Sequence, residues 1–271
     1  MKINYINYIN NIINKFVLNH MGNCIWLGKK KTSIKKHYIY KKNLISKGNK
    51  NIIPQIIHQI WIGTKKKPVR YMKTWYNDYI NMFPHYKYVF WDDKKIRNLL
   101  RKKKKLLDLY DMESTYYGKA DIARYFILYK YGGIYIDADS VWINNSNLDD
   151  LTNISTGFFI CREPNTDLLA NGVFGASKKH LYLKAIISYL VKLHPKYINI
   201  RSKKKPWEVT GPKLTTKIYK NKICNITIYP DYYFYPISWH GITNPNLHNE
   251  MDLPKDSYMF QYGISTNNLN Y

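Results

Sequence analysis

A helical segment that ends on two glycines and leads into a short apolar strand constrains this fold more than any other feature. The helix is predicted over Lys119–Tyr131, and Gly132-Gly133 supplies the C-terminal stop signal that glycine gives a helix. The strand that follows, predicted from Ile134 to Asp137, continues directly into the acidic run Asp137-Ala138-Asp139. A helix, a tight reversal and a strand ending on carboxylates is a unit of an α/β sheet.

Further strands and helices alternate before this unit. Strands are predicted at Ile56–Ile62 and Tyr86–Trp91, and helices at residues 70–82 and Ile96–Tyr110. Such alternation is typical of a sheet whose central strands are buried by helices on its faces. The predicted fold class is therefore α/β with a mixed, mostly parallel sheet, in one domain over residues 51–271.

The first 50 residues read as a basic N-terminal extension. Isoleucines at three- and four-residue steps predict an amphipathic helix within residues 1–20, and residues 28–50 form a lysine-rich connector. No acidic residue precedes Asp78, so residues 1–77 supply 16 of the 25 excess positive charges. A surface of this kind attracts nucleic acid, an anionic membrane or a phosphorylated ligand. The alternative is a solvated face in a lysine-rich composition.

Cysteine usage and hydropathy exclude other classes. Cys24, Cys161 and Cys224 are far apart and form no Cys-x-x-Cys pair, so neither a zinc ribbon nor a disulfide framework is predicted. The longest apolar runs fall short of the roughly 20 residues that a membrane span needs. No signal peptide pattern opens the chain. The predicted location is the cytoplasm, or the viral factory if the genome is that of a virus.

Two aspartates form a candidate metal site. Alternation along the strand would place Asp137, Asp139 and Tyr135 on one side of the sheet, with Ile134 and Ile136 in the core on the other. Ligands of open α/β sheets bind beyond the carboxyl ends of the strands. Two carboxylates there suit Mn²⁺ or Mg²⁺ bridging a diphosphate. An isolated Asp-x-Asp also occurs on many solvated turns.

The preceding helix carries a second candidate pair. Asp121 and Arg124 are three residues apart and therefore share a helix face. They could bind sugar hydroxyls and phosphate in one cleft. The alternative is a surface ion pair worth under about 1 kcal/mol.

Taken together, these segments resemble a known family, the glycosyltransferases whose sugar-binding region contains a DXD motif. They include α-mannosyl and α-galactosyl transferases and are distantly similar to the large clostridial glucosylating toxins. The matching segments follow the family's order across residues 52–240: Ile53–Gly63, Lys119–Tyr125, Tyr131–Asp139, Asn171–Ala176, Thr210–Pro212 and Tyr233–Pro236.

The resemblance implies a GT-A fold and a metal-dependent enzyme. It would move a hexose from a nucleotide-sugar, with UDP favoured over GDP, to a glycan, protein or lipid acceptor, and would retain the anomeric configuration. The implied cofactor is Mn²⁺ or Mg²⁺. The lysine-rich N-terminus could dock on an anionic membrane surface.

The resemblance also implies roles for seven residues, of which Asp121, Arg124, Asp137 and Asn171 are the expected catalytic ones. The full set is Trp61, stacked on the nucleobase; Asp121 and Arg124, holding the donor sugar; Tyr135, beside the nucleotide; Asp137, at hydroxyls and the metal; Asp139, the direct metal ligand; and Asn171, on the sugar or acceptor side.

Several of these residues also have a plain structural interpretation. Trp61 could be core, Asn171 could be a turn residue before Gly172, and His58 is expected to be a satisfied polar residue rather than a base. One departure from the family concerns Gln261, which stands where a metal-side histidine is expected.

Three other functions remain open at this stage. An inactive glycosyltransferase-like module would explain the C-terminal departure. A nucleic-acid-binding or anionic-surface protein would act through the basic N-terminal third. A different Mg²⁺ enzyme, such as a phosphatase or nuclease, fits the run from Asp137 to Val141 poorly.

Overall fold

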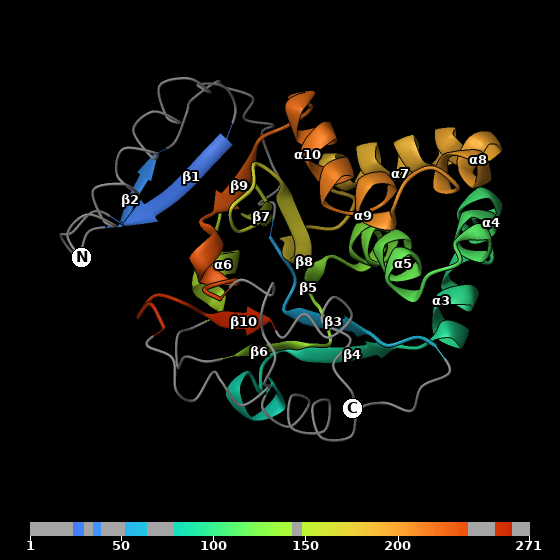
Figure 1. Ribbon diagram of the computed structural model, residues 1–271. Helices are drawn as coiled ribbons and strands as arrows, with labels where there is room; N and C mark the ends of the chain where they lie inside the picture. The colour runs from blue at the N-terminus through green and yellow to red at the C-terminus, as the bar shows by residue number, and fades with distance from the viewer. Residues whose placement is uncertain are drawn as a thin grey trace.

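The computed structural model describes residues 24–29, 35–38, 52–63, 79–142, 148–237 and 253–261. Within them, a large sheet has the strand order β2-β1-β9-β7-β8-β5-β3-β4 (Figure 1). Its strands are β1 (Cys24–Lys29), β2 (Lys35–Tyr38), β3 (Ile56–Ile60), β4 (Lys87–Trp91), β5 (Gly133–Ile136), β7 (Phe158–Arg162), β8 (Leu169–Ala176) and β9 (Ile226–Tyr229).

The sheet is mixed and mostly parallel, which confirms the predicted fold class. Strand β3 runs parallel to β4 and β5, and β9 runs parallel to β1 and β7. Strand β8 lies antiparallel between β5 and β7, and β2 is antiparallel to β1 at the edge. A second, two-stranded sheet pairs β6 (Ser140–Trp142) with β10 (Met259–Gln261), which come from distant parts of the chain.

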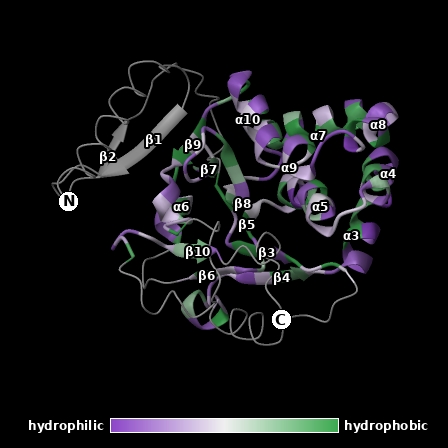
Figure 2. Ribbon diagram, in the orientation of Figure 1, coloured by the Kyte–Doolittle hydropathy of each residue, from purple (hydrophilic) through white to green (hydrophobic). Residues whose placement is uncertain are grey.

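Helices pack against the sheet, and the buried apolar residues form two layers, one on each face of the sheet. The helices are α3 (Asp93–Leu100), α4 (Lys104–Met112), α5 (Tyr116–Tyr131), α6 (Asp149–Thr152), α7 (Leu181–Leu193), α8 (Tyr197–Arg201), α9 (Pro206–Val209) and α10 (Pro212–Lys220), with 3-10 turns at His194–Lys196 and Asp231–Tyr233. Hydrophilic residues mark the outer turns of α4, α8 and α10 (Figure 2). None of the described helices is long and apolar enough to cross a bilayer.

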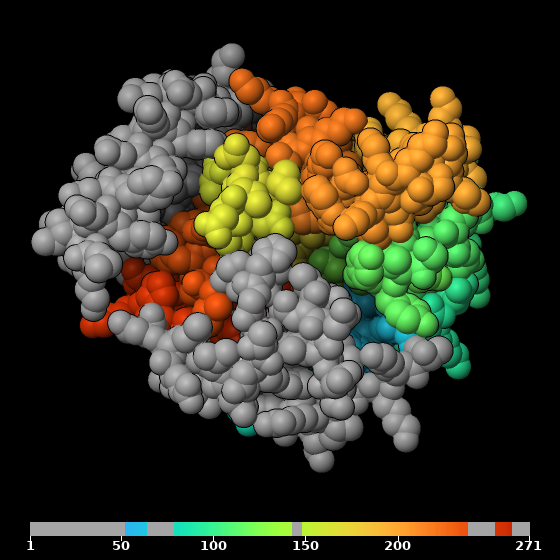
Figure 3. Space-filling view, viewed as in Figure 1, coloured from blue at the N-terminus to red at the C-terminus, as the bar shows by residue number. Residues whose placement is uncertain are grey.

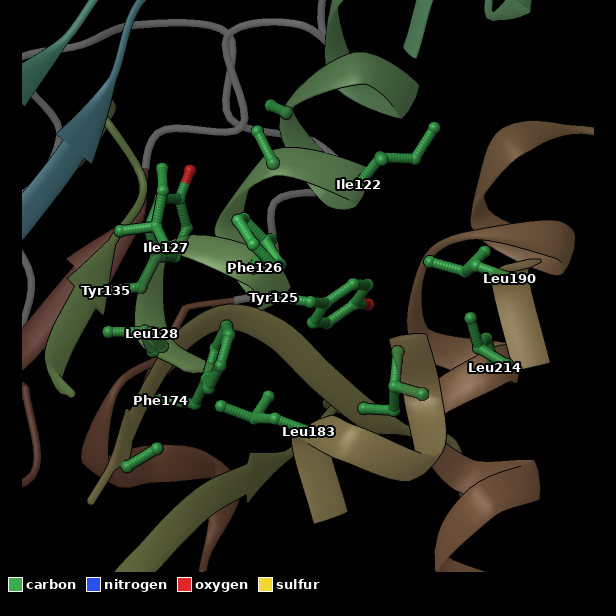
Figure 4. Close-up of a cluster of buried hydrophobic side chains, with 14 of the residues drawn as sticks. Ile122, Tyr125, Phe126, Ile127, Leu128, Tyr135, Phe174, Leu183, Leu190 and Leu214 are labelled. Carbon is green, nitrogen blue, oxygen red and sulfur yellow. The ribbon is translucent and has the colours of Figure 1, made fainter. Parts of the chain in front are cut away.

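Strand β5 divides the two core layers as its alternation predicts. Tyr135 packs into the layer under α5, α7 and α10, whereas Ile134 and Ile136 pack into the layer on the other face. Figure 4 shows Tyr135 beside Phe174 within the first of these layers.

The Gly-Gly stop acts as predicted. Gly132 and Gly133 have φ of +64° and +101°, a region that favours glycine. A Cβ on Gly133 would lie 2.5 Å from the carbonyl oxygen of Ile56. His58 fixes the same turn, since its Nε2–H donates to the Gly132 carbonyl at 2.9 Å while its Nδ1 accepts from Trp91 Nε1 at 3.0 Å. His58 is a satisfied buried residue, as expected.

One predicted helix is wrong. The segment Ile96–Tyr110 forms two helices, α3 and α4, separated by a turn at residues 101–103. The backbone N–H of Lys103 donates to the Leu100 carbonyl at 2.6 Å, a three-residue step that ends the α-helical ladder. The new direction lets α4 bury Leu106 and Leu109 while the charged run stays in solvent.

Two other expectations fall largely outside the described residues. The helix predicted within residues 1–20 lies outside them, and of the helix predicted over residues 70–82 only residues 79–82 are described, as helical. Strands β1 and β2 lie within the predicted extension, and β1 pairs with β9. The domain division after residue 50 stays a prediction.

Candidate active site

The two motif aspartates lie in a turn rather than on a strand. Strand β5 ends at Ile136, and residues 138–139 form a turn before β6 begins at Ser140. The backbone N–H of Asp137 donates to the Gly172 carbonyl at 2.8 Å, and the Ser140 N–H returns to the Asp137 carbonyl at 3.1 Å. The strand thus ends one residue earlier than predicted, but Tyr135 and Asp137 lie on one side as expected, because the Tyr135 hydroxyl donates to Oδ1 of Asp137 at 2.7 Å.

Gln261 brings the two carboxylates to a common point. Its Nε2 donates to Oδ2 of Asp137 and to Oδ1 of Asp139, at 3.0 Å each. The pairing of Gln261 with Ser140, where β10 meets β6, holds the amide there. The sequence position expected for a metal-side histidine is thus occupied by an amide in contact with both aspartates.

Arg124 is buried and contacts several residues of the site. Its Nη2 lies 3.2 Å from Oδ1 of Asp137 and 3.4 Å from Oδ1 of Asp121, and its Nη1 donates to the Asn171 carbonyl at 2.7 Å. The guanidinium also lies 4.4 Å from the ring centroid of Tyr135. Burial would lower the pKa of Arg124, but Asp137, Tyr135 and Asp121 outweigh it and raise that pKa above its usual range. The interpretation of this pair as a surface ion pair is wrong.

Asp121 is held by hydrogen bonds on both oxygens. Asn171 Nδ2 donates to Oδ1 at 2.8 Å, and Thr210 Oγ1 donates to Oδ2 at 2.9 Å. Burial raises the pKa of Asp121 to about 6, against the opposing effects of Arg124, Thr210 and Asn171. The carboxyl can therefore change charge near neutral pH. Thr210 belongs to a matching segment, but the sequence assigned it no role.

Asn171 lies in the middle of β8, so its interpretation as a turn residue is wrong. Besides Asp121, its Nδ2 contacts the hydroxyl oxygen of Tyr125 at 2.9 Å. The next residue, Gly172, allows close approach, since a Cβ there would lie 2.6 Å from Oδ2 of Asp137 and 2.9 Å from the hydroxyl of Tyr235. No local signal in the sequence identified Tyr125 or Tyr235 as neighbours of the site.

Tyr135 and Trp61 have different surroundings. The Tyr135 hydroxyl donates to Oδ1 of Asp137 at 2.7 Å. Because Tyr135 is only 1% exposed, it positions this carboxylate from the protein interior. Trp61 lies just after β3, where its backbone N–H donates to the Trp91 carbonyl at 3.0 Å and its ring packs against the second core layer. Their contacts with a nucleotide stay predictions.

Helices α5 and α9 border this network. The described α8–α9 segment packs on the helix pair α4–α5, and Figure 3 shows the orange and green segments meeting at the surface. Gly211, directly after Thr210, allows this contact, because a Cβ there would lie 2.8 Å from the Trp207 Cα and 3.2 Å from Oδ2 of Asp121.

The turn that carries Asp137 and Asp139, here called the acidic turn, fits a hard divalent cation. Among the described residues no group of three His, Cys, Asp or Glu side chains could hold a metal. Mg²⁺-type sites, however, are often built from one or two carboxylates, water and substrate phosphates. Asp137 and Asp139 face one point, and turning the Gln261 amide over would present its carbonyl oxygen there. The donor set therefore suits Mn²⁺ or Mg²⁺ once a phosphate is present.

Known proteins are similar to this chain in sequence and in fold. Residues 68–156, which contain the Asp121–Arg124 pair and the two motif aspartates, match the family described as "Glycosyltransferase sugar-binding region containing DXD motif". The "Uncharacterized glycosyltransferase L373" of Acanthamoeba polyphaga mimivirus is 30% identical over 213 residues, covering 75% of this chain and 78% of that protein.

Two further proteins are similar over shorter or more distant matches. "Inositol phosphoceramide mannosyltransferase 3" of Schizosaccharomyces pombe is 34% identical over 139 residues, covering 51% of this chain and 37% of that protein. The solved structure of "PaToxG Glycosyltransferase" superposes with a TM-score of 0.51 at 20% identity, over 64% of this chain and 70% of that one, which shows the GT-A-like fold. The chain belongs to the family of glycosyltransferases whose sugar-binding region contains the DXD motif.

Proposed function

We propose that this glycosyltransferase moves a hexose from a nucleotide-sugar to a lipid-linked acceptor. One observation carries the donor part: the buried Asp121–Arg124–Asp137 network joins directly to the Asp139–Gln261 contact. The groups that we propose for sugar binding and for phosphate binding are thus parts of one connected network.

The acidic turn would hold the donor diphosphate through a divalent cation. Asp137 and Asp139 supply the carboxylates, and Gln261 supplies an amide oxygen after rotation. The cation would supply charge neutralisation for the leaving diphosphate. Arg124 is fixed by four contacts before any substrate arrives, so its charge costs little reorganisation when negative charge develops nearby.

Asp121 and Asn171 would hold the donor sugar. A carboxylate with a pKa of about 6 accepts hydrogen bonds from sugar hydroxyls once ionised, above that pH. Asn171 fixes the orientation of Asp121 and ties it to Tyr125. Each carboxylate of this network already has a hydrogen-bond or ion-pair partner, which favours attack by the acceptor on the leaving-group face over a covalent intermediate. The proposed outcome is retention.

The acceptor proposal rests on a relative's name. A protein named for mannosylation of inositol phosphoceramide is 34% identical to about half of this chain. A sphingolipid-type acceptor is therefore the first to test, with mannose as the first sugar. The preference for UDP over GDP remains a prediction.

The test is a donor-hydrolysis screen followed by transfer. Purified protein would be incubated with Mn²⁺ and UDP- or GDP-linked hexoses, beside Asp139→Asn. Release of one nucleotide, lost with chelator and in the variant, is the expected result. Transfer to ceramide-based acceptors and NMR of the product anomer then follow. An inverted anomer would refute retention, and the absence of turnover or metal-dependent binding with every donor would refute the donor assignment.

A further inference from the structure

A cavity separate from the active site opens between α4, α5 and α7. Its volume is about 380 Å³. Phe126, Ile187 and Val191 form part of an apolar floor. The three helices pack together at one end of the molecule (Figure 1).

Lysines surround this floor. Lys103, Lys104, Lys105 and Lys184 all line the cavity, and all four are exposed. In the part of the chain that the structure describes, none of the four belongs to an ion pair. Four ammonium groups therefore share one opening without an acidic partner.

The chain segments around the cavity reinforce this charge. No Asp or Glu occurs in residues 94–107, 122–136 or 168–207, which supply all of its lining. The two acidic residues of α4 that follow are engaged elsewhere, Asp108 with His194 at 3.3 Å and Asp111 with Arg97 at 2.7 Å. The lining of the cavity is thus positively charged, with four lysines and no acidic residue.

The cavity is distinct from the sugar-binding network. Phe126 faces the cavity from α5, whereas Asp121 and Arg124 face β8 and the acidic turn. The cavity and the network therefore share helix α5 but no residue.

We propose that this cavity docks the headgroup of an anionic phospholipid at a membrane surface. Lysines near an anionic bilayer contribute favourable binding energy additively, and the four on the rim match a negatively charged headgroup. The apolar floor matches the first methylenes of the acyl chains, which a free phosphate and a soluble headgroup both lack. The cavity volume lies within the range of ordinary ligand pockets. The proposal does not depend on the acceptor proposed above.

The experiment is co-sedimentation of the full chain with vesicles of phosphatidylcholine, with or without phosphatidylserine. Lys103→Gln/Lys104→Gln/Lys105→Gln is expected to lower partitioning onto the anionic vesicles by at least about tenfold. The matched control is Lys203→Gln/Lys204→Gln/Lys205→Gln, which removes the same charge from three consecutive exposed lysines outside the cavity. The control is expected to lose no more than about threefold.

A second variant tests the floor. Ile187→Asn keeps every charge and is expected to weaken vesicle binding severalfold. Soluble glycerophosphoserine, which carries the headgroup without acyl chains, is expected not to displace the protein. Thermal unfolding and donor hydrolysis at wild-type levels would show that the variants fold.

Three outcomes would overturn the proposal. Equal losses in the two triple variants would show a general charge effect. Full displacement by glycerophosphoserine, with Ile187→Asn unchanged, would show a site for free anions. If Lys103→Gln/Lys104→Gln/Lys105→Gln lost binding to a single-stranded RNA probe and kept its binding to anionic vesicles, the surface would be assigned to nucleic acid.

Discussion

Gln261 Nε2 lies 3.0 Å from Oδ2 of Asp137, a residue 124 positions earlier in the chain. The same nitrogen contacts Asp139, so an amide donor stands between two carboxylates. Without a cation this contact offsets the repulsion between the aspartates. With one bound, the amide must turn over, because a carboxamide offers a metal its oxygen and not its NH₂ group.

Gln261→Ala is expected to weaken Mn²⁺ binding by about tenfold, since it removes one oxygen ligand and keeps both carboxylates. Electron paramagnetic resonance of free Mn²⁺ during titration measures this without turnover. Gln261→His, which introduces a nitrogen ligand, should bind Mn²⁺ at least as well as the native residue. Unchanged affinity in the alanine variant would remove Gln261 from the metal site.

Gly172→Ala is expected to displace Asp137, because the new Cβ would lie 2.6 Å from its Oδ2. Overpacking of this kind costs about 1–3 kcal/mol of unfolding free energy. The matched control is Gly175→Ala on the same strand, whose Cβ would meet the Phe159 ring at 2.3 Å. Both variants should lose stability in denaturant titrations, but only Gly172→Ala should lose Mn²⁺ affinity as well. Equal Mn²⁺ affinity in the two would contradict the close approach of Gly172 to the site.

Donor turnover is expected to rise with pH through about 6, as Asp121 ionises. Thr210→Val removes one hydrogen bond to the ionised form and should move this midpoint to higher pH. Asp121→Asn should abolish the transition and lower the rate. A pH–rate profile that is identical for wild type and Thr210→Val would exclude Asp121 as its source.

The contribution of Asp121 to stability falls as the pH rises, whereas turnover is expected to rise. Its pKa is raised in the folded state, so the folded protein binds more protons than the unfolded chain between about pH 4 and 6. This contribution is fully present below that window and is lost as the pH rises through it. Asp121→Asn is therefore expected to gain stability relative to wild type on going from pH 4 to 7, as measured by urea unfolding at both values.

His58 makes the protein less stable in acid. Burial lowers its pKa to about 4, against a smaller opposing effect of the Gly132 carbonyl. The unfolded chain then binds more protons between about pH 4 and 6.5, so this contribution is present above that window and is lost as the pH falls through it. From pH 7 to 5 the loss is about 2 kcal/mol. In His58→Gln, urea unfolding should show a smaller drop over this interval, whatever its stability at pH 7.

Local sequence patterns are sufficient to predict the unit at the centre of the protein. The helix before Gly132, the reversal and strand β5 follow from local periodicity and from backbone angles that glycine tolerates best. The motif aspartates were found for the same reason, since they come directly after that strand. The pairing of Asp121 with Arg124 followed from the three-residue spacing of one helix.

The surroundings of those residues depend on contacts between distant parts of the chain. Asn171 reaches Asp121 because β8 inserts antiparallel beside β5, and Gln261 reaches the acidic turn because β10 pairs with β6. Registers between strands so far apart in the chain depend on loop closure and side-chain packing, which no local period records. The break between α3 and α4 has a similar origin, because one straight helix would carry Leu106 and Leu109 away from the core that α4 buries them in.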